Sequence, residues 1–372
     1  MNYTYDGDGN RLSMTTQDGT NSYGYDNLNR LISAAHPPST FLPFLNESFS
    51  YDAVGNRLSD ASITGYSYNA ANELTSNSSF TYVYDNNGNQ TSVKSVLTGQ
   101  ATGYNYDGQN ELVSATLPAG NAAYAYDAMG RRVERTTNTA VGAPIYYVYD
   151  MQDILAEVDG AGDLIALFTR GPGIDEPLEL RQGGGTEYFI HADALGSVVA
   201  HTDNTGTVVE RIEYEVYGQP MFLDLRSGSP LVESQSFTGS PYAFTARPFD
   251  PETGLYYNDS RYRDPVTGGF ISPDPLGVIE GGDVDLYSYV VDQPTKWIDP
   301  SGTATAPSML SPALSPAIFG LPPIFSAPGL TPPKNPPKPP QFQPIPYPQC
   351  LSNPAAPGPI PTCWLQELLI PV

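Results

Sequence analysis

An aromatic pair recurs along the first 150 residues, and it constrains the fold more than any other feature. Each copy holds an aromatic residue, one spacer residue, a tyrosine and then Asp or Asn. Successive second tyrosines are 16 to 26 residues apart, which fits one strand-turn-strand unit per copy. Residues two apart share one face of a strand, so each copy presents two rings to one side. The eight copies begin at Tyr3, Tyr23, Phe49, Tyr66, Tyr82, Tyr104, Tyr124 and Tyr147.

Stacking such hairpins edge to edge extends one sheet with a shared aromatic face, because a single hairpin buries too little to be stable. At roughly 25 cal/mol per Å² and about 150 to 250 Å² per ring, two rings per repeat contribute several kcal/mol before entropy is subtracted. A composition of 26 Tyr, 35 Gly and 37 Pro with only 15% charged residues also favours strands and turns. The sequence predicts an all-β fold, a ribbon of hairpins that twists and curls.

The turn after each pair comes in two lengths. An apolar residue follows the second tyrosine at plus six in four copies, at Leu31, Leu74, Leu112 and Leu155. In the other four copies Gly stands at plus four. There the apolar residue stands at plus seven, at Leu12, Leu58 and Val133, and the remaining copy has the polar Thr91 at that position. Because Gly supplies a positive φ without steric cost, we predict that the longer connection is a bulged hairpin. The Asp or Asn that opens each turn can bond backbone amides.

The first turn, from Asp6 to Asn10, also resembles a calcium loop of the D-x-D-x-N type. It has Gln17 where such a loop carries Glu at its twelfth position, and no helices flank it. The turn interpretation is therefore preferred, and we predict no metal site.

The three histidines are His36, His191 and His201, and none has a companion Cys or second His at metal-ligand spacing. We interpret His191 as a hydrogen-bonded structural residue. No Gly-rich phosphate loop in a strand-turn-helix context is present, so the sequence predicts no cofactor.

Charge and hydropathy exclude two classes of partner. The formal net charge is −23, from 17 Lys and Arg against 40 Asp and Glu, so a phosphate backbone would be repelled and we predict no nucleic-acid binding. No run of about 18 apolar residues is present, and the first residues lack a basic and apolar leader, so neither a membrane span nor a Sec-type signal is predicted. The two cysteines, Cys350 and Cys363, leave the repeats without a disulfide framework.

From Glu187 the pattern changes to YFIHADALGSVVAHTDNTGTVVERIEYEVYGQP, followed by FTARPFDPETGLYYNDSRYRDPVTGGFISPDPLG and LYSYVVDQPTKWIDPSG. These segments predict short strands joined by Asp-Pro, Thr-Gly and Asp-Asn turns. We expect Tyr256, Tyr257, Tyr262 and Phe270 to be buried aromatics of this part.

Together, the tyrosine repeats and these segments resemble the YD/Rhs repeats and Rhs-associated core domain of bacterial Rhs proteins, Tc-toxin C subunits and animal teneurins. The resemblance covers residues 1–303 and implies a repeat array at 1–186, a core module at 187–303 and a variable tail at 304–372. It implies a ribbon that spirals into a shell around cargo, with the core module closing one end. Here the cargo would be the C-terminal segment of the chain itself. The resemblance further implies secretion or cell-surface display by a non-Sec route, with a component of a secretion apparatus as partner.

In many members of that family the core module cuts the chain through an aspartic-protease-like site. Its pattern is a D-P-x-G, a second D-P-x-G-L some two dozen residues later, and an upstream Arg. The matching catalytic residues here are Asp274, Asp299 and Arg261. Two close carboxylates cannot both ionise easily, so one would keep a proton and polarise the carbonyl while the other activates water. We expect Arg261 to hold one carboxylate in a bidentate pair.

This chain departs from the pattern at the cutting position, because Thr303 replaces the leucine after which the family cuts. A small polar residue fills an apolar pocket poorly, and Asp-Pro-x-Gly is also an ordinary turn sequence. Self-cleavage after Thr303 and an inert structural core are both open on the sequence.

The tail, residues 304–372, holds 20 prolines in 69 positions, with charges only at Lys334, Lys338 and Glu367. It should be disordered and polyproline-like, and it lacks the residue clusters that nuclease, deaminase or ribosyltransferase chemistry requires. An SH3-ligand-like tail and a short membrane-active effector are the two interpretations.

The sequence therefore favours a non-enzymatic Rhs-type β-shell scaffold that encapsulates or presents its C-terminal segment, with latent self-cleavage. The alternative is a cell-surface module that binds carbohydrate or protein, because exposed tyrosine arrays can stack on sugars.

Overall fold

The computed structural model describes residues 1–37, 46–138, 143–173, 175–278, 284–303 and 306–307. All of these belong to the first of two compact units, residues 1–318 and 319–372. Apart from residues 306 and 307, the predicted proline-rich tail and both cysteines therefore fall outside the described residues. As predicted, the described chain is a succession of β-strands.

The strands form five sheets, and neighbours within each sheet are antiparallel. The N-terminal sheet holds β1 (Asn2–Tyr5), β2 (Arg11–Thr16), β3 (Gly19–Tyr25), β4 (Leu31–Ala35) and β5 (Glu47–Ser48). A pair follows, β6 (Ser50–Tyr51) and β7 (Arg57–Ser59). The long sheet begins with β8 (Ser67–Tyr68), β9 (Leu74–Ser76), β10 (Phe80–Tyr84), β11 (Gln90–Ser95), β12 (Ala101–Tyr106), β13 (Leu112–Leu117), β14 (Gly120–Tyr126), β15 (Arg132–Thr137) and β16 (Ile145–Asp150).

The long sheet continues, each strand pairing with the next, through β17 (Asp153–Val158), β18 (Leu164–Arg170), β19 (Pro177–Gln182), β20 (Glu187–Ala192), β21 (Val198–Thr202), β22 (Val208–Tyr214), β23 (Pro220–Asp224) and β24 (Leu231–Glu233). The strands up to β24 are called the ribbon below. The later elements are η1 (Phe244–Ala246), β25 (Phe249–Asp250), β26 (Leu255–Asn258), β27 (Arg261–Asp264), β28 (Gly269–Phe270), η2 (Val290–Asp292), β29 (Trp297–Ile298) and β30 (Ala306–Pro307). Because β19 pairs with β20, the ribbon runs on past residue 186, and the predicted domain boundaries stay a prediction.

Seven of the eight repeats share one turn length, with or without glycine, so the prediction that glycine marks a longer hairpin is wrong. Tyr5 pairs with Arg11 and Tyr25 with Leu31, six residues on in both versions, and both pairings contain a register shift. Gly9 has a φ of 79° in the version with glycine, and Asn29 has a φ of 63° in the other. Asn tolerates this left-handed conformation, so glycine marks the conformation of that position and not an added residue.

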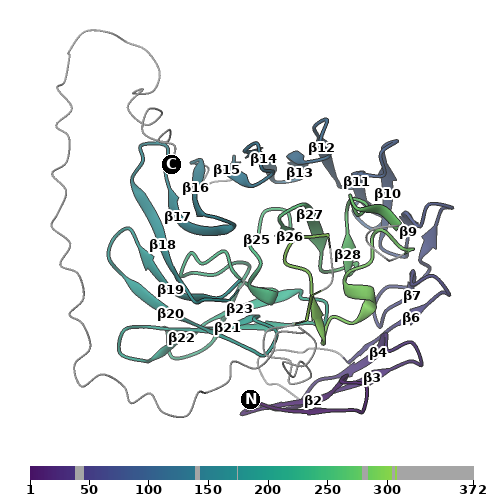
Figure 1. Ribbon diagram of the computed structural model, residues 1–372, viewed down its shortest axis with the longest axis horizontal. Helices are drawn as coiled ribbons and strands as arrows, with labels where there is room; N and C mark the ends of the chain where they lie inside the picture. The colour runs from purple at the N-terminus through teal and green to yellow at the C-terminus, as the bar shows by residue number, and fades with distance from the viewer. Residues whose placement is uncertain (38–45, 139–142, 174, 279–283, 304–305, 308–372) are drawn as a thin grey trace, which may run out of the picture. The chain divides into compact units, whose positions relative to one another are not determined.

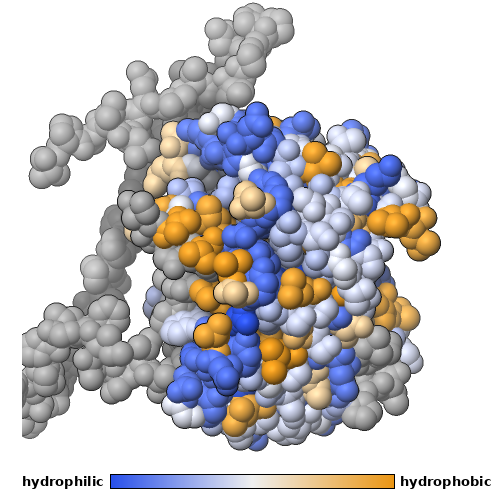
Figure 2. All heavy atoms as spheres, turned by 90° about the vertical axis from the view of Figure 1, so that its right-hand side faces the viewer, coloured by the Kyte–Doolittle hydropathy of each residue, from blue (hydrophilic) through white to orange (hydrophobic). Residues whose placement is uncertain are grey.

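The residue at plus six faces inward, which corrects the predicted core. Leu12 and Leu58, at plus seven, are 41% and 42% exposed. Outward apolar side chains like these contribute apolar patches between polar ones on the surface (Figure 2). In the last copy the turn is one residue shorter, so Ile154 is buried and the predicted Leu155 is exposed. In the four copies with glycine, the inward residues are Arg11, Arg57, Gln90 and Arg132, and all are buried.

Inward arginines are tolerated because their guanidinium groups lie over aromatic rings. The Cζ of Arg11 is 4.7 Å from the ring centroid of Tyr3, and the Cζ of Arg132 is 5.3 Å from that of Tyr124. A cation over a ring face is attracted by the ring quadrupole, more strongly where water is excluded. The aromatic pair and the buried arginine therefore form one packing unit.

The aspartate that opens each turn binds backbone amides, as predicted. In the first repeat, Oδ1 of Asp6 accepts hydrogen bonds from the backbone N–H groups of Asp8 at 2.9 Å and Asn10 at 2.8 Å. The same pair of bonds recurs at Asp52 and at Asp127. These bonds support the turn interpretation over a calcium loop. Within the described ranges, no group of three or more His, Cys, Asp or Glu could hold a metal ion.

The second tyrosine of a repeat ties that repeat to the one before it. The hydroxyl of Tyr25 donates to the carbonyl oxygen of Arg11 at 2.7 Å, and the hydroxyl of Tyr149 donates to that of Arg132 at 2.8 Å. Tyr51, Tyr68 and Tyr126 make the same bond to the preceding repeat. This ladder accounts for the tyrosine at the second position in these five copies.

Replacing Tyr149 with Phe should lower the free energy of unfolding by about 1 kcal/mol, because the carbonyl oxygen of Arg132 loses its donor. Urea unfolding followed by circular dichroism measures the change. Tyr146→Phe is the matched control, since Tyr146 is 37% exposed and should shift stability by less than about 0.5 kcal/mol. Equal effects of the two substitutions would contradict the ladder.

The ribbon curls until its first repeats meet its last strands. The hydroxyl oxygen of Tyr3 accepts a hydrogen bond from the backbone N–H of Ala194 at 3.2 Å. Asp18 forms an ion pair with Arg211 of β22. Figure 1 shows the ribbon bending around β25–β28. The predicted spiral is confirmed, and side chains join its two ends.

Residues 242–278 and 284–303, which follow the ribbon and carry η1, β25–β28, η2 and β29, pack against its aromatic face and are called the plug below. Tyr262 of the plug has its ring centroid 5.5 Å from that of Tyr124, and Tyr287 lies 5.9 Å from Tyr84. The predicted buried aromatics are confirmed, because Tyr256, Tyr257, Tyr262 and Phe270 are at most 5% exposed. Rings of the ribbon and of the plug therefore form common hydrophobic clusters.

A buried carboxyl makes stability depend on pH. Burial raises the pKa of Glu157 in β17 to about 7, while the nearby Arg135 and Arg132 oppose the shift. Unfolding frees a carboxyl that ionises near pH 4.5. The folded state therefore holds the proton more tightly, and stability should fall as pH rises from about 4.5 to about 7, by at most about 3 kcal/mol.

Glu157→Gln should remove this dependence, so the variant should gain stability relative to the parent between pH 5 and pH 8. Urea midpoints of both proteins across that range test the prediction. Glu134→Gln is a control on β15, which is separated from β17 by β16, because Glu134 is less buried than Glu157. A constant difference between the parent and Glu157→Gln would refute the assignment.

Candidate functional site

The three residues predicted to be catalytic lie on different segments of the plug and meet at one point. Arg261 begins β27, Asp274 follows β28, and Asp299 follows β29. The Nη2 atom of Arg261 is 3.1 Å from Oδ2 of Asp274 and 3.4 Å from Oδ2 of Asp299. Their side chains are 4%, 13% and 3% exposed, in that order. The structure therefore brings the predicted residues into one buried ion cluster.

Arg261 does not form the expected bidentate pair with one carboxylate. A single nitrogen serves both carboxylates, and the others bind backbone: Nη1 donates to the carbonyl oxygen of Leu286 at 2.9 Å, and Nε donates to that of Gly302. Its Cζ also lies 3.6 Å from the ring centroid of Phe270. Burial lowers the pKa of Arg261, and the two carboxylates oppose this shift.

A guanidinium between two carboxylates has a chemical consequence. The guanidinium offsets the repulsion between the two carboxylates. The predicted sharing of a proton depends on that repulsion. Proton sharing between Asp274 and Asp299 stays a prediction. Arg261 is thus a cation that bridges two carboxylates and also binds a peptide carbonyl.

Each carboxylate also caps a turn. Oδ1 of Asp274 accepts a hydrogen bond from the backbone N–H of Leu276 at 2.8 Å, and Oδ1 of Asp299 accepts one from that of Thr303 at 3.1 Å. Each Asp-Pro-x-Gly segment is thus a turn whose aspartate turns one oxygen to the backbone and the other to Arg261. The two turns and the ion cluster therefore share the same two carboxylates, and a catalytic role for them stays a prediction.

The loop after β29 is fixed against β26 and β27. The side-chain amide of Asn258 donates to the carbonyl oxygen of Asp299 at 2.7 Å, and the backbone N–H of Ser260 donates to that of Ser301 at 3.1 Å. At Gly302, which has a φ of 70°, an added Cβ would lie 2.2 Å from the backbone oxygen of Asn258. Only glycine fits there, so the loop is seated tightly beside Arg261.

A cavity of about 670 Å³ opens beside this loop. The plug contributes Arg261, Pro275 and Ser301 to its lining, and the ribbon contributes Tyr106 and Glu111. Burial and the neighbouring Asp107 raise the pKa of Glu111 to about 7. The volume lies in the range of small-ligand pockets.

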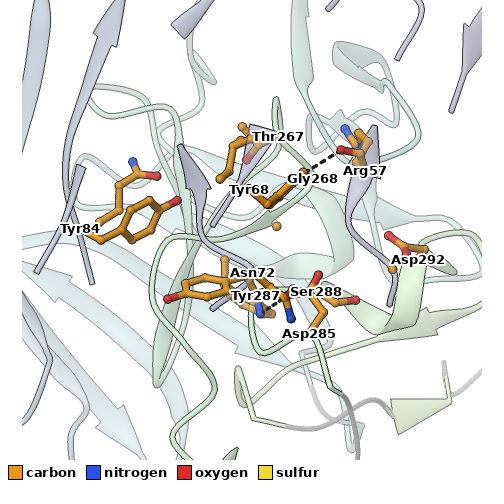
Figure 3. Close-up of a pocket in the computed structure, with 15 residues that line it drawn as sticks. Arg57, Tyr68, Asn72, Tyr84, Thr267, Gly268, Asp285, Tyr287, Ser288 and Asp292 are labelled. Carbon is orange, nitrogen blue, oxygen red and sulfur yellow. Dashed lines mark hydrogen bonds between the residues drawn. The ribbon is translucent and has the colours of Figure 1, made fainter. Parts of the chain in front are cut away.

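A second, smaller pocket of about 60 Å³ lies between the ribbon and the plug (Figure 3). Arg57 lies over the ring of Tyr217, with 4.1 Å from Cζ to the centroid, and Asp285, Tyr287 and Ser288 line the pocket. A polar space of this size suits ordered water. Arg57 faces inward, which was not predicted from the sequence. Its signal was the repeated Gly-Asn-Arg-Leu order, in which the leucine was taken for the core residue.

The histidines take structural positions. A ring nitrogen of His191 lies 3.0 Å from Oγ1 of Thr202, which fits the structural interpretation. Buried His201 has its Nδ1 2.7 Å from Oε2 of Glu210 on the neighbouring strand.

Across the described part of the chain, no helix is long and apolar enough to cross a membrane.

The aromatic ribbon around its plug defines a YD-repeat β-shell protein. The family model for the teneurin YD-shell matches residues 43–278, and the model for the RHS repeat matches residues 5–39. The chain belongs to the teneurin YD-shell family.

The curated relatives include proteins named as nucleases and as toxins. The chain is 30% identical over 290 residues to the tRNA nuclease WapA of Bacillus subtilis (strain 168), a match that covers 75% of this chain and 12% of WapA. It is 27% identical to the double-stranded DNA deaminase toxin A of Burkholderia cenocepacia (strain H111), covering 82% of this chain and 22% of the toxin. The chain thus spans a small part of each. The crystal structure of TcdB2-TccC3-Cdc42 aligns with 81% of this chain and 19% of its own, at 19% identity and a TM-score of 0.43.

Proposed function

We propose that this chain is the closing end of a YD-repeat shell, in which the ribbon grips the plug and the plug presents the C-terminal segment to solvent. The contact between the inward rings and the plug carries the proposal. Tyr124 lies on Tyr262 and Tyr84 on Tyr287, so repeats from distant parts of the ribbon contact the plug. The cavity of about 670 Å³ beside the loop after β29 is too small to hold a segment of 69 residues.

The same contacts count against the alternative of a carbohydrate-binding surface. The inward rings Tyr82, Tyr104, Tyr124 and Tyr147 are only 5% to 7% exposed. A ring must expose a face to stack on a sugar, so these tyrosines are not available to a glycan.

The relatives support a role in toxin delivery. Proteins named as a tRNA nuclease and a DNA deaminase toxin share this region and extend far beyond it. We therefore assign the chain the part of a scaffold in a toxin protein that leaves the cell by a non-Sec route. Its partners are its own C-terminal segment and a component of the secretion apparatus.

Reaction of lysine amines with an acylating reagent tests presentation. Lys334 and Lys338 of the tail should react in the native protein as fast as Lys94, which is exposed in the structure. Mass spectrometry of peptides gives the three rates, and a urea-unfolded sample normalises them. Tail lysines that react at least about tenfold more slowly than Lys94 would show enclosure and overturn presentation.

Self-cleavage near the second Asp-Pro-x-Gly is a second candidate function, favoured by the cluster of Arg261, Asp274 and Asp299. One guanidinium contacts both carboxylates and a carbonyl of the neighbouring loop, so charged groups converge on a peptide segment. The family pattern puts the cut after Thr303. Mass spectrometry of the purified chain measures it, and Asp274→Asn should abolish it.

A further inference from the structure

The carbonyl that Arg261 holds belongs to the peptide bond between Gly302 and Thr303. The Nε of Arg261 donates to the oxygen of Gly302 in a buried setting. A donor aimed at a carbonyl oxygen stabilises negative charge that develops there during attack on the carbon. This bond lies one residue before the cut that the family pattern implies.

The side chain of Thr303 is linked by hydroxyl groups to a carboxylate. Its Oγ1 lies 2.9 Å from Oγ of Ser301, and that Oγ donates to Oδ1 of Asp299 at 3.4 Å. The same Oδ1 accepts a hydrogen bond from the backbone N–H of Thr303 at 3.1 Å. Oδ1 of Asp299 therefore contacts the Ser301 hydroxyl, which links it to the Thr303 hydroxyl, and also the nitrogen of the Gly302–Thr303 bond.

We propose that the chain cuts itself at the Gly302–Thr303 bond, with the Thr303 hydroxyl as the nucleophile. This inference rests on the proposed self-cleavage and replaces its cutting position. Oγ1 of Thr303 attacks the carbonyl carbon of Gly302 and passes its proton through Ser301 to Asp299. The carbonyl oxygen takes up the negative charge and is held by Arg261.

The cyclic intermediate then collapses with cleavage of the C–N bond. Asp299 returns its proton to the leaving nitrogen, with which it is already hydrogen-bonded. The products of this step are an ester between Gly302 and Oγ1 of Thr303 and a free amine at Thr303. Water hydrolyses the ester, which leaves a carboxylate on Gly302 and restores the hydroxyl. The reaction consumes one water and needs no other reactant.

The other residues of the site act by position. Asp274 contacts Nη2 of Arg261, which keeps the guanidinium oriented for the Gly302 carbonyl. The absence of a side chain at Gly302 lets the loop lie against Asn258, where a Cβ would clash. Thr303, which breaks the family pattern, here supplies the reacting oxygen.

The N-terminus of the released fragment tests the mechanism in the full chain. Intact-mass and N-terminal peptide analysis should give fragments 1–302 and 303–372. Thr303→Ser should still cut, whereas Thr303→Val, which keeps the shape and lacks the hydroxyl, should not. Circular dichroism of the Val variant confirms that it folds. Hydroxylamine should accelerate the cut in the parent chain and leave a hydroxamic acid on Gly302, because it attacks esters.

Three results would overturn the inference. A fragment that begins at Ala304 would refute the threonine route and support cleavage by the two carboxylates. Cutting in Thr303→Val at the parent rate would refute the nucleophile. A parent chain that stays intact with hydroxylamine would refute self-cleavage altogether. The acylation rates of Lys334 and Lys338 test the scaffold function separately.

Discussion

Replacing Arg132 with alanine should lower the free energy of unfolding by about 3 to 5 kcal/mol, because it leaves a buried charge without its main partner. Arg132 is 1% exposed, and Asp250 of the plug is 0% exposed. Nη2 of Arg132 donates to Oδ1 of Asp250 at 3.1 Å, and Nη1 donates to the hydroxyl of Tyr262 at 3.0 Å. Its Cζ also lies 4.5 Å from the ring centroid of Tyr257. The substitution thus removes charge and packing at the contact between ribbon and plug.

The neighbouring residue is a matched control. Arg131 forms an ion pair with Asp127, and both side chains are 24% exposed. Such a partly exposed pair contributes about 0 to 1 kcal/mol, so Arg131→Ala should change stability little. Urea unfolding followed by circular dichroism measures both variants. Equal and small losses would show that Arg132 is not buried against the plug.

Arg261→Met should also cost about 3 to 5 kcal/mol, because the side chains of Asp274 and Asp299 lose the cation between them. The carbonyl oxygens of Leu286 and Gly302 lose donors as well. The same unfolding assay applies. Adding Asp274→Asn to Arg261→Met should restore part of the loss, since one uncompensated charge disappears. A double variant less stable than Arg261→Met would contradict the ion cluster.

The all-β ribbon could be predicted from the sequence because its signal is local and repeated. Rings two residues apart share one face of a strand, and every copy has this spacing, as Tyr124 and Tyr126 do in β14. The inward arginines could not be predicted by the same reasoning. At Arg57 and Leu58 the pattern offers a charged and an apolar residue side by side, and one step of register decides which one faces inward.

The register itself depends on backbone conformation that residue spacing does not show. Gly9 and Asn29 adopt the same left-handed conformation, so two turn sequences that look unequal produce one hairpin. The inward arginines are stabilised by rings that lie over them, Tyr217 of the ribbon at Arg57 and Tyr257 of the plug at Arg132. That environment comes from residues more than 100 positions away along the chain.

The candidate site was reached through family resemblance and not through spacing. Asp274, Asp299 and Arg261 lie on three segments, and only the packing of the plug makes them neighbours. How Arg261 divides its donors among two carboxylates and the Gly302 carbonyl depends on the loop after β29, which sequence patterns do not position. The departure at Thr303 leaves self-cleavage and an inert core both open on the sequence, and the hydroxyl contacts of Thr303 support a different route.

The central claim is that ribbon and plug fold as one unit through inward side chains. A double-mutant cycle between Arg132 of the ribbon and Asp250 of the plug, using Arg132→Met and Asp250→Asn, measures that contact directly. We predict a coupling energy of about 1.5 to 3 kcal/mol, as for buried groups in direct contact. Losses that add to within about 0.5 kcal/mol would mean that the two residues do not touch, and the account of a ribbon closed on its plug would be wrong.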